Sequence, residues 1–460
     1  MTTGAQPAPP RGLYLHVPFC RSLCPYCDFV VVAGAAAFGP RSRMGGYLNA
    51  IEQEIDLRAT LTDKTFGSLG SADRQPLETL YLGGGTPSLL PTDRLAALIE
   101  RIRDRFGLAP DAEVTLEANP GADERGDLAG VVQAGVTRLS VGVQVMDTTA
   151  LRALGRRHTP DDVVATIAAA RAAGFASISM DLLADLPDLP FDAWAASLDA
   201  AIALAPDHLS VYALTLSLGP DESGDDRLAT PAGAVAWRER AAAAQDEERG
   251  ALELEHLNSR LPAAGYDWYE ISNWATAGHE SKHNTLYWER ASVAAVGPGA
   301  HAFDGVTRRW NSANLDAWEG ALQQSELPPG GESPAESGAA GAAEGLVLAL
   351  RMARGVERDV AVRDFDQSSS ARSTSERNSR QYSTSTTTAV TTLRKLTAVT
   401  TSTPLLKAKR AATWLAPIMK AISSKVPKAA PLKRAGVVKA MPSCSGVKAQ
   451  TPGMQATETQ

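Results

Sequence analysis

The chain has 460 residues, of which 44% are hydrophobic and 21% charged, so it can bury a large core and has room for about two or three domains. Residues 367–460 carry fifteen basic and two acidic side chains, whereas residues 1–366 carry 30 basic and 50 acidic ones, a net charge of −20. Such an acidic body argues against a nucleic-acid partner. Because no stretch holds roughly eighteen uninterrupted apolar residues, and the start has no apolar run, we expect a cytoplasmic protein without a membrane span or a secretory signal.

Apolar runs typical of strands recur along the first half of the chain, with helical periodicity between them. Strands are predicted at residues 13–17, 79–82, 113–116, 138–141, 177–182 and 208–214, and helices at residues 47–59, 92–106, 160–173 and 191–203. This alternation predicts an α/β fold with parallel strands joined by right-handed crossovers. An open doubly wound sheet and a partial barrel both satisfy the pattern, and in both folds ligands bind at the carboxyl ends of the strands.

Polar motifs follow the first three predicted strands at these ends. Three cysteines follow the first strand, residues 83–87 (Gly-Gly-Gly-Thr-Pro) follow the second, and residues 117–120 (Glu-Ala-Asn-Pro) follow the third. Because the carboxyl ends of parallel strands lie at one edge of the sheet, we expect these motifs to meet in one site.

The three cysteines, Cys20, Cys24 and Cys27, can hold three corners of a 4Fe-4S cluster and leave its fourth iron open. Only one other cysteine, Cys444, is present, and it is far away in the sequence, which argues against a disulfide framework. Zinc is the alternative, but a structural zinc site usually needs four ligands in two separated pairs, and no second pair exists. His16 could supply a fourth ligand or could simply end a strand.

A domain boundary is predicted near residue 225, because residues 219–250 lack the landmarks of the preceding alternation. Residues 12–225 would form the core domain, and residues 226–355 a smaller α+β region. An aromatic block within this second region could form a wall against a large flat ligand, or it could form a core or a subunit contact. The block comprises Tyr266, Trp268, Tyr269, Trp274, Tyr287, Trp288, Phe303, Trp310 and Trp318.

Both ends of the chain are predicted to be disordered. At the start, this prediction covers residues 1–11. From about Asp366 onward, Ser, Thr, Lys, Ala and Pro replace the acidic, alternating sequence, and residues 356–460 form a basic tail of low complexity. Such a composition cannot bury enough apolar area to offset chain entropy. An altered reading frame would also explain the abrupt change from acidic to basic composition.

In combination, these motifs resemble the radical S-adenosylmethionine superfamily, and within it the branch that contains oxygen-independent coproporphyrinogen III oxidase and the HemW-type heme chaperone. The resemblance covers about residues 12–355. It rests on ordered blocks, namely residues 14–20, the cysteine triad, and residues 83–88, 117–120, 141–144, 269–273 and 297–301. It implies a partial (β/α)6 TIM-type barrel that binds a 4Fe-4S cluster through Cys20, Cys24 and Cys27, together with S-adenosylmethionine.

The resemblance also implies which residues contact S-adenosylmethionine. Tyr14 would lie beside the sulfonium, a glycine-rich segment would cradle the amino-acid part, and four polar side chains would contact the cofactor at successive strand ends. Carboxylates at these positions could instead cap helices, and an arginine could pair with acids facing solvent. The residues assigned in this way are Tyr14, Tyr26, Gly84, Gly85, Thr86, Glu117, Gln144, Arg156 and Asp181.

Two positions separate the chaperone from the oxidase. The oxidase typically has a fourth cysteine two residues beyond the triad, where this chain has Phe29. Residues 283–288 (His-Asn-Thr-Leu-Tyr-Trp) resemble a signature of the chaperone branch, and His283 could ligate heme iron beside aromatic rings. A buried, hydrogen-bonded histidine would explain His283 equally well.

The resemblance therefore favours a heme chaperone over its alternative, an oxidase that decarboxylates two propionates of a porphyrinogen to vinyl groups. An iron-sulfur protein with decayed activity is a third alternative. The implied partners are heme or porphyrinogen, recipient hemoproteins and an electron donor of the flavodoxin or ferredoxin type. Pairing of two chains and peripheral membrane contact are compatible with this interpretation.

This chain departs from the family in two places. The family usually has Gly-Leu-Pro-Gly after its fifth strand, but residues 185–188 read Asp-Leu-Pro-Asp. Side chains at a tight turn that is otherwise free of them are expected to weaken S-adenosylmethionine binding. The family's C-terminal domain has no recognisable counterpart beyond about Gly355.

Overall fold

The computed structural model describes residues 6–39, 42–71, 74–216, 232–336 and 338–356. Apart from residue 356, the predicted tail of residues 356–460 lies outside the described residues, as do residues 1–5. Just before the first strand, the Ala8 N–H donates to Asp304 O at 2.7 Å, and the Ser292 hydroxyl donates to Ala8 O at 2.8 Å. The disorder predicted for residues 1–11 therefore does not extend to this part of the N-terminal segment.

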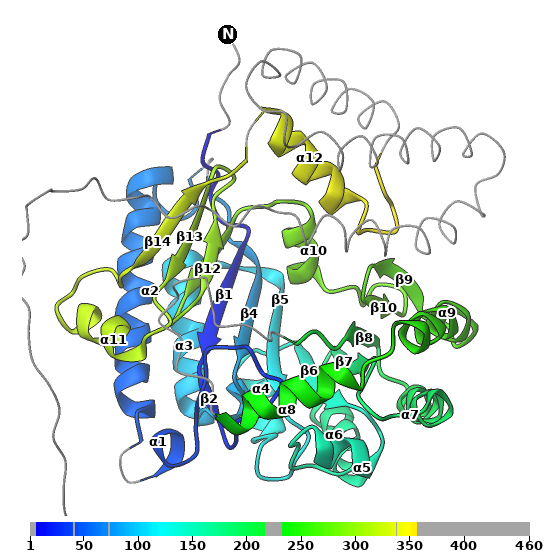
Figure 1. Cartoon of the computed structure of the whole chain (residues 1–460). Coiled ribbons are helices and arrows are strands. Elements are labelled where there is room, and N and C mark those ends of the chain that lie inside the picture. Colours follow the sequence, from blue (N-terminus) through cyan, green and yellow to red (C-terminus); the bar gives the residue numbers. More distant parts are fainter. Residues whose placement is uncertain (1–5, 40–41, 72–73, 217–231, 337, 357–460) are drawn as a thin grey trace, which may run out of the picture. The chain divides into compact units, whose positions relative to one another are not determined.

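Six parallel strands form the centre of one twelve-stranded sheet, in the order β14-β13-β12-β11-β1-β4-β5-β6-β7-β8-β10-β9 (Figure 1). The central strands are β1 (Gly12–Val17), β4 (Leu77–Gly84), β5 (Leu108–Ala118), β6 (Arg138–Gln144), β7 (Ser177–Ala184) and β8 (His208–Ala213). Each pairs in parallel with the next, so the six predicted strands are confirmed.

Helices connect these strands, and the predicted helices are confirmed as parts of them. They are α2 (Met44–Phe66), α3 (Thr92–Phe106), α4 (Leu128–Gln133), α5 (Thr148–Ala153), α6 (Pro160–Ala173) and α7 (Phe191–Ala203). Side-chain caps fix several starts. Thr159 and Asp162, for example, form a reciprocal capping box at the start of α6. Among the described residues, no helix is both long enough and apolar enough to cross a membrane.

The order of the central strands selects the partial barrel. A doubly wound sheet reverses its strand order at a switch point, whereas these six strands follow one another in chain order. Right-handed crossovers in one direction place the connecting helices on one face, and α2, α3, α4 and α6 pack against each other in succession. β1 pairs with β4 and β11, and β8 pairs with β7 and β10, so the barrel is not closed.

Residues 226–355 extend the same sheet at both edges. β11 (Val293–Val296) pairs in parallel with β1, and β12 (His301–Phe303), β13 (Thr307–Asn311) and β14 (Gly330–Pro334) continue antiparallel. At the other edge, β10 (Asn273–Ala275) and β9 (Asp267–Glu270) follow β8. The helices of this region are α8 (Ala232–Ala243), α9 (Glu247–Ala263), α10 (Lys282–Trp288), α11 (Leu315–Gln323) and α12 (Gly338–Ala349). The described residues on either side of the predicted boundary thus share one sheet, and the boundary near residue 225 stays a prediction.

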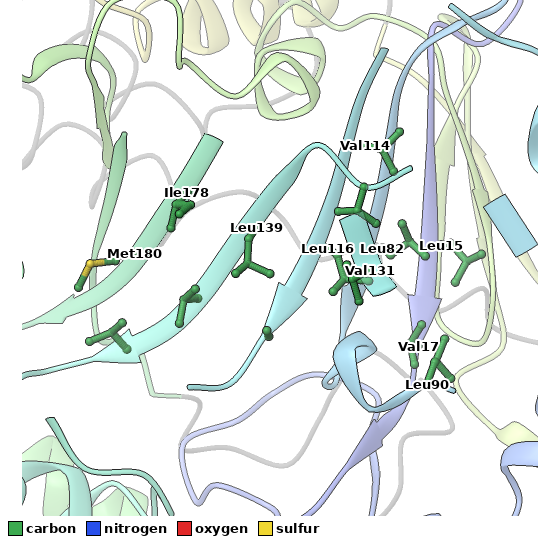
Figure 2. Close-up of a cluster of buried hydrophobic side chains, with 14 of the residues drawn as sticks. Leu15, Val17, Leu82, Leu90, Val114, Leu116, Val131, Leu139, Ile178 and Met180 are labelled. Carbon is green, nitrogen blue, oxygen red and sulfur yellow. The ribbon is translucent and has the colours of Figure 1, made fainter. Parts of the chain in front are cut away.

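The central strands carry opposite chemistry on their two faces. Alternate side chains are apolar and buried in one core with residues of the helices, as for Leu116 of β5 and Val131 of α4 (Figure 2). The side chains between them are mostly polar and line the cavity described below. The apolar set labelled in Figure 2 comprises Leu15, Val17, Leu82, Leu90, Val114, Leu116, Val131, Leu139, Ile178 and Met180.

A short separate pair of strands anchors the segment that holds the cysteines. β2 (Phe19–Cys20) pairs in parallel with β3 (Val32–Ala33) and closes the base of residues 20–33, called the cysteine loop below. α1 (Ala35–Phe38) follows it, and the short helix η1 (Pro87–Leu89) follows β4.

The aromatic block contributes to the core more than to a wall. Trp274 and Trp318 are fully buried, and Tyr266 is buried as well. Tyr287 lines the cavity, whereas the other aromatic residues of the block are not among its lining residues. The core alternative therefore holds for these three residues, and Trp268 packs against the same core.

Candidate functional site

A cavity of about 520 Å³ lies against the polar face of the central strands, between the cysteine loop and α10. This volume lies within the range of small-molecule sites, ~300–1,000 Å³. Its walls include every residue predicted from the sequence, namely Tyr14, Cys20, Cys24, Tyr26, Cys27, Gly84, Gly85, Thr86, Glu117, Gln144, Arg156, Asp181 and His283. The fold brings the whole predicted set together, and the role of each residue stays a prediction.

The three cysteines of the cysteine loop are free thiols that are half-buried. Burial raises the pKa of Cys20 to about 12 and that of Cys27 to about 11, so bound metal would have to displace these protons. Among the described residues, no three His, Cys, Asp or Glu side chains converge on one metal ion. Three thiols in one loop are the donor set of a cluster with one open iron, whereas a structural zinc site usually takes four ligands.

A chain of hydrogen bonds joins two of the cysteine sulfurs. The Thr86 hydroxyl lies 3.5 Å from Cys20 Sγ and accepts from Asn119 Nδ2 at 3.1 Å. Arg156 donates to Asn119 Oδ1 at 2.5 Å and to Gly142 O at 2.7 Å, and its other terminal nitrogen lies 3.7 Å from Cys24 Sγ. Arg156 thus faces a cysteine sulfur and strand ends rather than acids in solvent, and N–H groups near sulfur stabilise a thiolate.

The electrostatics of Arg156 agree with this position. Burial by itself would lower the pKa of its guanidinium, but the neighbouring Tyr26 and Cys24 raise that pKa above its usual range. Burial has the opposite effect on the Tyr26 phenol and raises its pKa, so this phenol stays neutral. The cysteine loop therefore has one permanent positive charge beside Cys24.

The glycine-rich segment after β4 has a structural reason for its glycines. A Cβ atom on Gly84 would lie 2.3 Å from the His16 ring, and one on Gly85 would lie 2.7 Å from Phe19 O. The N–H groups of Gly85 and Thr86 donate to Val17 O and Phe19 O, both at 2.8 Å. These N–H groups thus hold the start of the cysteine loop, and a ligand at this segment would meet its carbonyl oxygens instead.

His16, the alternative fourth ligand, has both ring nitrogens engaged. Nδ1 lies 3.0 Å from the Tyr14 hydroxyl, and Nε2 lies 2.7 Å from Val30 O near the end of the cysteine loop. Burial lowers the pKa of His16 to about 4, so the ring is neutral at physiological pH. His16 therefore ties β1 to the cysteine loop, and Tyr14 stacks on Tyr81 on the cavity side.

Glu117 and Asp181 are strand residues that line the cavity, and neither caps a helix. Glu117 accepts from the Tyr81 hydroxyl at 2.7 Å and from the Gly84 N–H at 2.9 Å. Burial raises the pKa of Glu117 to about 7, although both hydrogen bonds favour the charged form. Burial also raises the pKa of Asp181, which accepts from the Ser140 hydroxyl at 2.7 Å.

A second polar network, which the sequence did not suggest, continues from Asp181. The Ser179 hydroxyl lies 3.2 Å from Asp181 Oδ1 and 2.8 Å from His208 Nδ1, and His208 Nε2 lies 2.9 Å from the Tyr269 hydroxyl. Burial lowers the pKa of His208 well below its usual value. The sequence contained one signal of this network, namely polar residues spaced two apart in the predicted strands 177–182 and 208–214. Because successive side chains of a strand face opposite sides, such residues share one face of the sheet.

His283 is buried at the other end of the cavity, near the starts of β1 and β4. Its Nδ1 lies 2.7 Å from the Thr79 hydroxyl, and its Nε2 lies 3.0 Å from the Tyr287 hydroxyl. Burial lowers the pKa of His283 to about 3. Ligation of heme iron by Nε2 would require that nitrogen to leave Tyr287, whereas the Thr79 contact could remain.

Helix α8 holds the cysteine loop from outside, in a segment where the sequence offered no landmark. Arg238 is buried, and it donates to Pro25 O and to Cys27 O, both at 2.8 Å. Its guanidinium also lies 2.8 Å from a carboxylate oxygen of Asp28. A lone arginine in a helical segment carries no sequence signal of this role.

The turn after β7 has a backbone conformation that glycine favours, and weaker S-adenosylmethionine binding stays a prediction. Asp185 and Asp188 both adopt positive φ, at 53° and 58°, where the family usually has glycine. Asp185 is compensated, because it accepts from Arg249 at 2.9 Å and from the Asp246 N–H at 3.1 Å. Gln144 also has positive φ, at 67°, at the cavity end of β6.

Comparisons with known proteins agree with these features. Residues 14–200 match the family model described as the radical SAM superfamily. The chain is 38% identical over 327 residues to the heme chaperone HemW of Mycobacterium tuberculosis, and the aligned region covers 71% of this chain and 77% of that protein. It is 33% identical over 293 residues to the heme chaperone HemW of Escherichia coli, and here the aligned region covers 64% of this chain and 70% of that protein.

The fold is also similar to the solved structure of coproporphyrinogen III oxidase (HemN) from Escherichia coli. The TM-score is 0.61 at 23% identity, over 76% of this chain and 77% of that one. At this identity the likeness shows the fold alone, so the assignment within the superfamily rests on the sequence relatives. With its cysteine triad and strand-end motifs in family order, the chain belongs to the HemW-type branch of the radical S-adenosylmethionine superfamily.

Proposed function

We propose that this chain is a heme chaperone that binds a 4Fe-4S cluster, S-adenosylmethionine and heme, and that it delivers heme to recipient hemoproteins. The names of its relatives support this proposal, since the proteins from M. tuberculosis and E. coli are heme chaperones. The observation that carries it is a single cavity bounded by the three free thiols at one end and by His283 and Tyr287 at the other.

The proposed cluster ligands are Cys20, Cys24 and Cys27. When bound, such a cluster supplies an electron and one open iron position. Arg156 and Thr86 would orient Cys24 and Cys20 through their contacts with the sulfur atoms. Partial burial of these cysteines would limit the access of solvent to a cluster bound on the cavity side.

S-adenosylmethionine would occupy the part of the cavity next to the cysteine loop. Carbonyl oxygens of residues 84–86 would accept from its amino group, since the N–H groups there are engaged. Glu117, Gln144 and Asp181 would provide polar contacts along the strand ends. Glu117 would hold a proton or a negative charge depending on pH, because its pKa is about 7.

Heme would occupy the remainder of the cavity and its mouth. Large side chains that line the cavity are exposed on both of its sides, namely Phe29 of the cysteine loop at 67% and Tyr287 of α10 at 42%. A flat macrocycle would lie against these side chains, with His283 Nε2 as the proposed iron ligand and Nδ1 donating to Thr79.

Several finer features belong to the same proposal. An electron donor of the flavodoxin or ferredoxin type would reduce the cluster. Pairing of two chains and contact with a membrane surface are compatible with delivery of heme. The acidic charge of residues 1–366 favours partners other than nucleic acid.

Anaerobic reconstitution of the full chain with iron and sulfide, followed by parallel assays of heme binding and coproporphyrinogen consumption, tests the proposal. We expect heme uptake without porphyrinogen turnover, and loss of the brown cluster and its acid-labile sulfide when Cys20, Cys24 and Cys27 become alanine. Turnover of coproporphyrinogen would favour the oxidase instead. Neither activity would indicate a decayed iron-sulfur protein.

A matched pair of histidine variants tests the proposed iron ligand. His283→Ala should abolish the heme Soret shift, whereas His301→Ala should leave it unchanged, because His301 is exposed and does not line the cavity. Equal heme spectra for both variants would remove His283 from the proposal without affecting the cluster ligands.

A further inference from the structure

Two neighbouring buried groups on the cavity wall have no hydrogen-bond partner. Arg138, at the start of β6, is 3% exposed, and Thr115 of β5 is 1% exposed. The two residues are partners in the β5–β6 register, and both line the cavity. Nη2 of Arg138 and Oγ1 of Thr115 are both unpartnered. Of the unpartnered buried donors among the described residues, these two line the cavity, and their position side by side indicates a missing acceptor there.

The rest of the Arg138 guanidinium is fixed. Its Nη1 donates to the Ser177 hydroxyl at 3.0 Å and to His279 O at 2.9 Å, and it lies 3.7 Å from Glu113 Oε2. Glu113 in turn accepts from the His283 N–H at 3.0 Å. The guanidinium is thus held in place by its first terminal nitrogen while its second remains free at the cavity wall.

The two carboxylates near this pair, Glu113 and Asp181, are both engaged by other groups. Glu113 is the carboxylate within 4 Å of Arg138 and is also held by His283 and Ser281. Asp181 is turned toward the hydroxyls of Ser140 and Ser179. Arg138 Nη2 and Thr115 Oγ1 therefore each lack an acceptor from the described part of the chain.

We propose that Arg138 Nη2 and Thr115 Oγ1 donate to a carboxylate of the cavity's ligand, and that this carboxylate is a propionate of heme. This assignment rests on the proposed function, because it deepens the heme site. Its position relative to the proposed iron ligand supports it, since Glu113 contacts both Arg138 and the backbone of His283.

The carboxylate of S-adenosylmethionine is a weaker candidate. That group would lie at the open iron beyond the carboxyl ends of the strands, whereas Arg138 is the first residue of β6 and Gln144 the last. Six steps of a strand span about 20 Å, so one small carboxylate could not serve both ends. A porphyrin carries propionates on one edge of a large ring and can reach deeper.

Comparison of hemin with its dimethyl ester tests the proposal in the reconstituted full chain. Esterification removes the negative charge of the propionates and leaves the macrocycle unchanged. We expect wild type to bind hemin about ten-fold more tightly than the ester, the effect of one hydrogen bond between charged groups. Arg138→Gln should reduce this ratio to nearly one, and Arg138→Lys should retain part of it.

Thr115→Val gives a second test of the proposal, and this test does not change Arg138. Removal of an unpartnered buried hydroxyl should leave the unfolding midpoint unchanged or raise it, while lowering the hemin-to-ester ratio about three-fold. A purely structural hydroxyl would give the opposite pattern. Arg58→Gln serves as the control, because Arg58 is a buried arginine that does not line the cavity, and its ratio should match wild type.

An unchanged ratio in Arg138→Gln and Thr115→Val would overturn the proposal and assign the space to ordered water. Loss of S-adenosylmethionine affinity in Arg138→Gln, with an unchanged ratio, would overturn it in favour of the other carboxylate. If wild type bound neither hemin nor its ester, the proposed function would fail and this assignment with it. The two failures can be told apart. If wild type binds hemin but Arg138→Gln has no effect on the ratio, only the assignment of the propionate to Arg138 and Thr115 is rejected.

Discussion

The two faces of the central strands obey different rules. On the face toward the helices, the alternate residues of β5, β6 and β7 are apolar and nearly fully buried, as at Leu116, Leu139 and Ile178 (Figure 2). On the cavity face, the residues between them are polar or charged, as at Glu117 and Ser140. The first face is explained by folding, since burial of apolar area stabilises the chain.

The cavity face is not explained by folding. Buried polar groups cost free energy unless every one is satisfied, and this face has raised carboxylate pKa values and unpartnered donors. Strained or unsatisfied groups cluster at functional sites because selection for ligand binding maintains them. The contrast teaches that stability and ligand binding are divided between alternate residues of the same strands, and it can be tested with neighbouring pairs.

The largest expected effect comes from adjacent residues of β6. Leu139→Ala should lower the free energy of unfolding by about 3 kcal/mol, because Leu139 is fully buried and the truncation leaves a cavity. Ser140→Ala removes one hydrogen bond to Asp181 and should cost about 1 kcal/mol. Urea unfolding measures both variants, and hemin and S-adenosylmethionine titrations should show weaker binding only for Ser140→Ala. Weaker ligand binding in Leu139→Ala alone would break the comparison.

A somewhat smaller effect is expected where α8 supports the cavity from outside. Arg238→Gln removes donors to Pro25 O and Cys27 O and the ion pair with Asp28, a loss of about 2–3 kcal/mol in the stability of the cysteine loop. The variant should lose iron to a chelator faster than wild type. Arg240→Gln, at an exposed position on the same helix, is the matched control and should behave like wild type. Equal rates for the two variants would show that the loop is held by its own strand pair.

Glu117 gives a pH test of the cavity face, on the order of 2 kcal/mol. The folded pKa of about 7 lies above the ordinary carboxyl value, so between pH 4.5 and 7 the folded state keeps a proton that the unfolded state has lost. Stability from this group is therefore full below pH 4.5 and falls as pH rises to 7. Glu117→Gln should remove this slope from the difference between variant and wild type in urea unfolding. An identical slope in both proteins would place the proton elsewhere.

The sequence predicted the apolar face and the strand-end motifs well for a physical reason. Hydrophobic periodicity is a local property, so β1 and α3 could be placed from runs of a few residues. Motifs after successive parallel strands must also meet, and this rule brought Cys20, Gly84 and Glu117 into one cavity.

The remaining parts of the site depend on contacts between distant segments. His208 and Tyr269 meet although 61 positions separate them, and Arg238 reaches the cysteine loop across 213 positions from Pro25. No local pattern encodes such contacts. Arg138 had a local signal in its two-residue spacing from Ser140, but the polar partners that leave one of its nitrogens free became evident only in three dimensions.

The smallest expected effect concerns the turn that leads from β7 at the cavity to α7 on the helical face. Asp188→Gly should raise the free energy of unfolding by about 0.5 kcal/mol, because glycine adopts positive φ without the steric cost that an L side chain incurs, partly offset by chain entropy. Asp185→Gly should instead lower it, because the contacts with Arg249 and the Asp246 N–H are lost. Urea unfolding of the two variants gives the signs directly. Opposite signs would show that contacts with the start of α9 compensate the backbone strain at Asp185, whereas the strain at Asp188 stays uncompensated. An increase in the free energy of unfolding for both variants would mean that the Asp185 contacts contribute little.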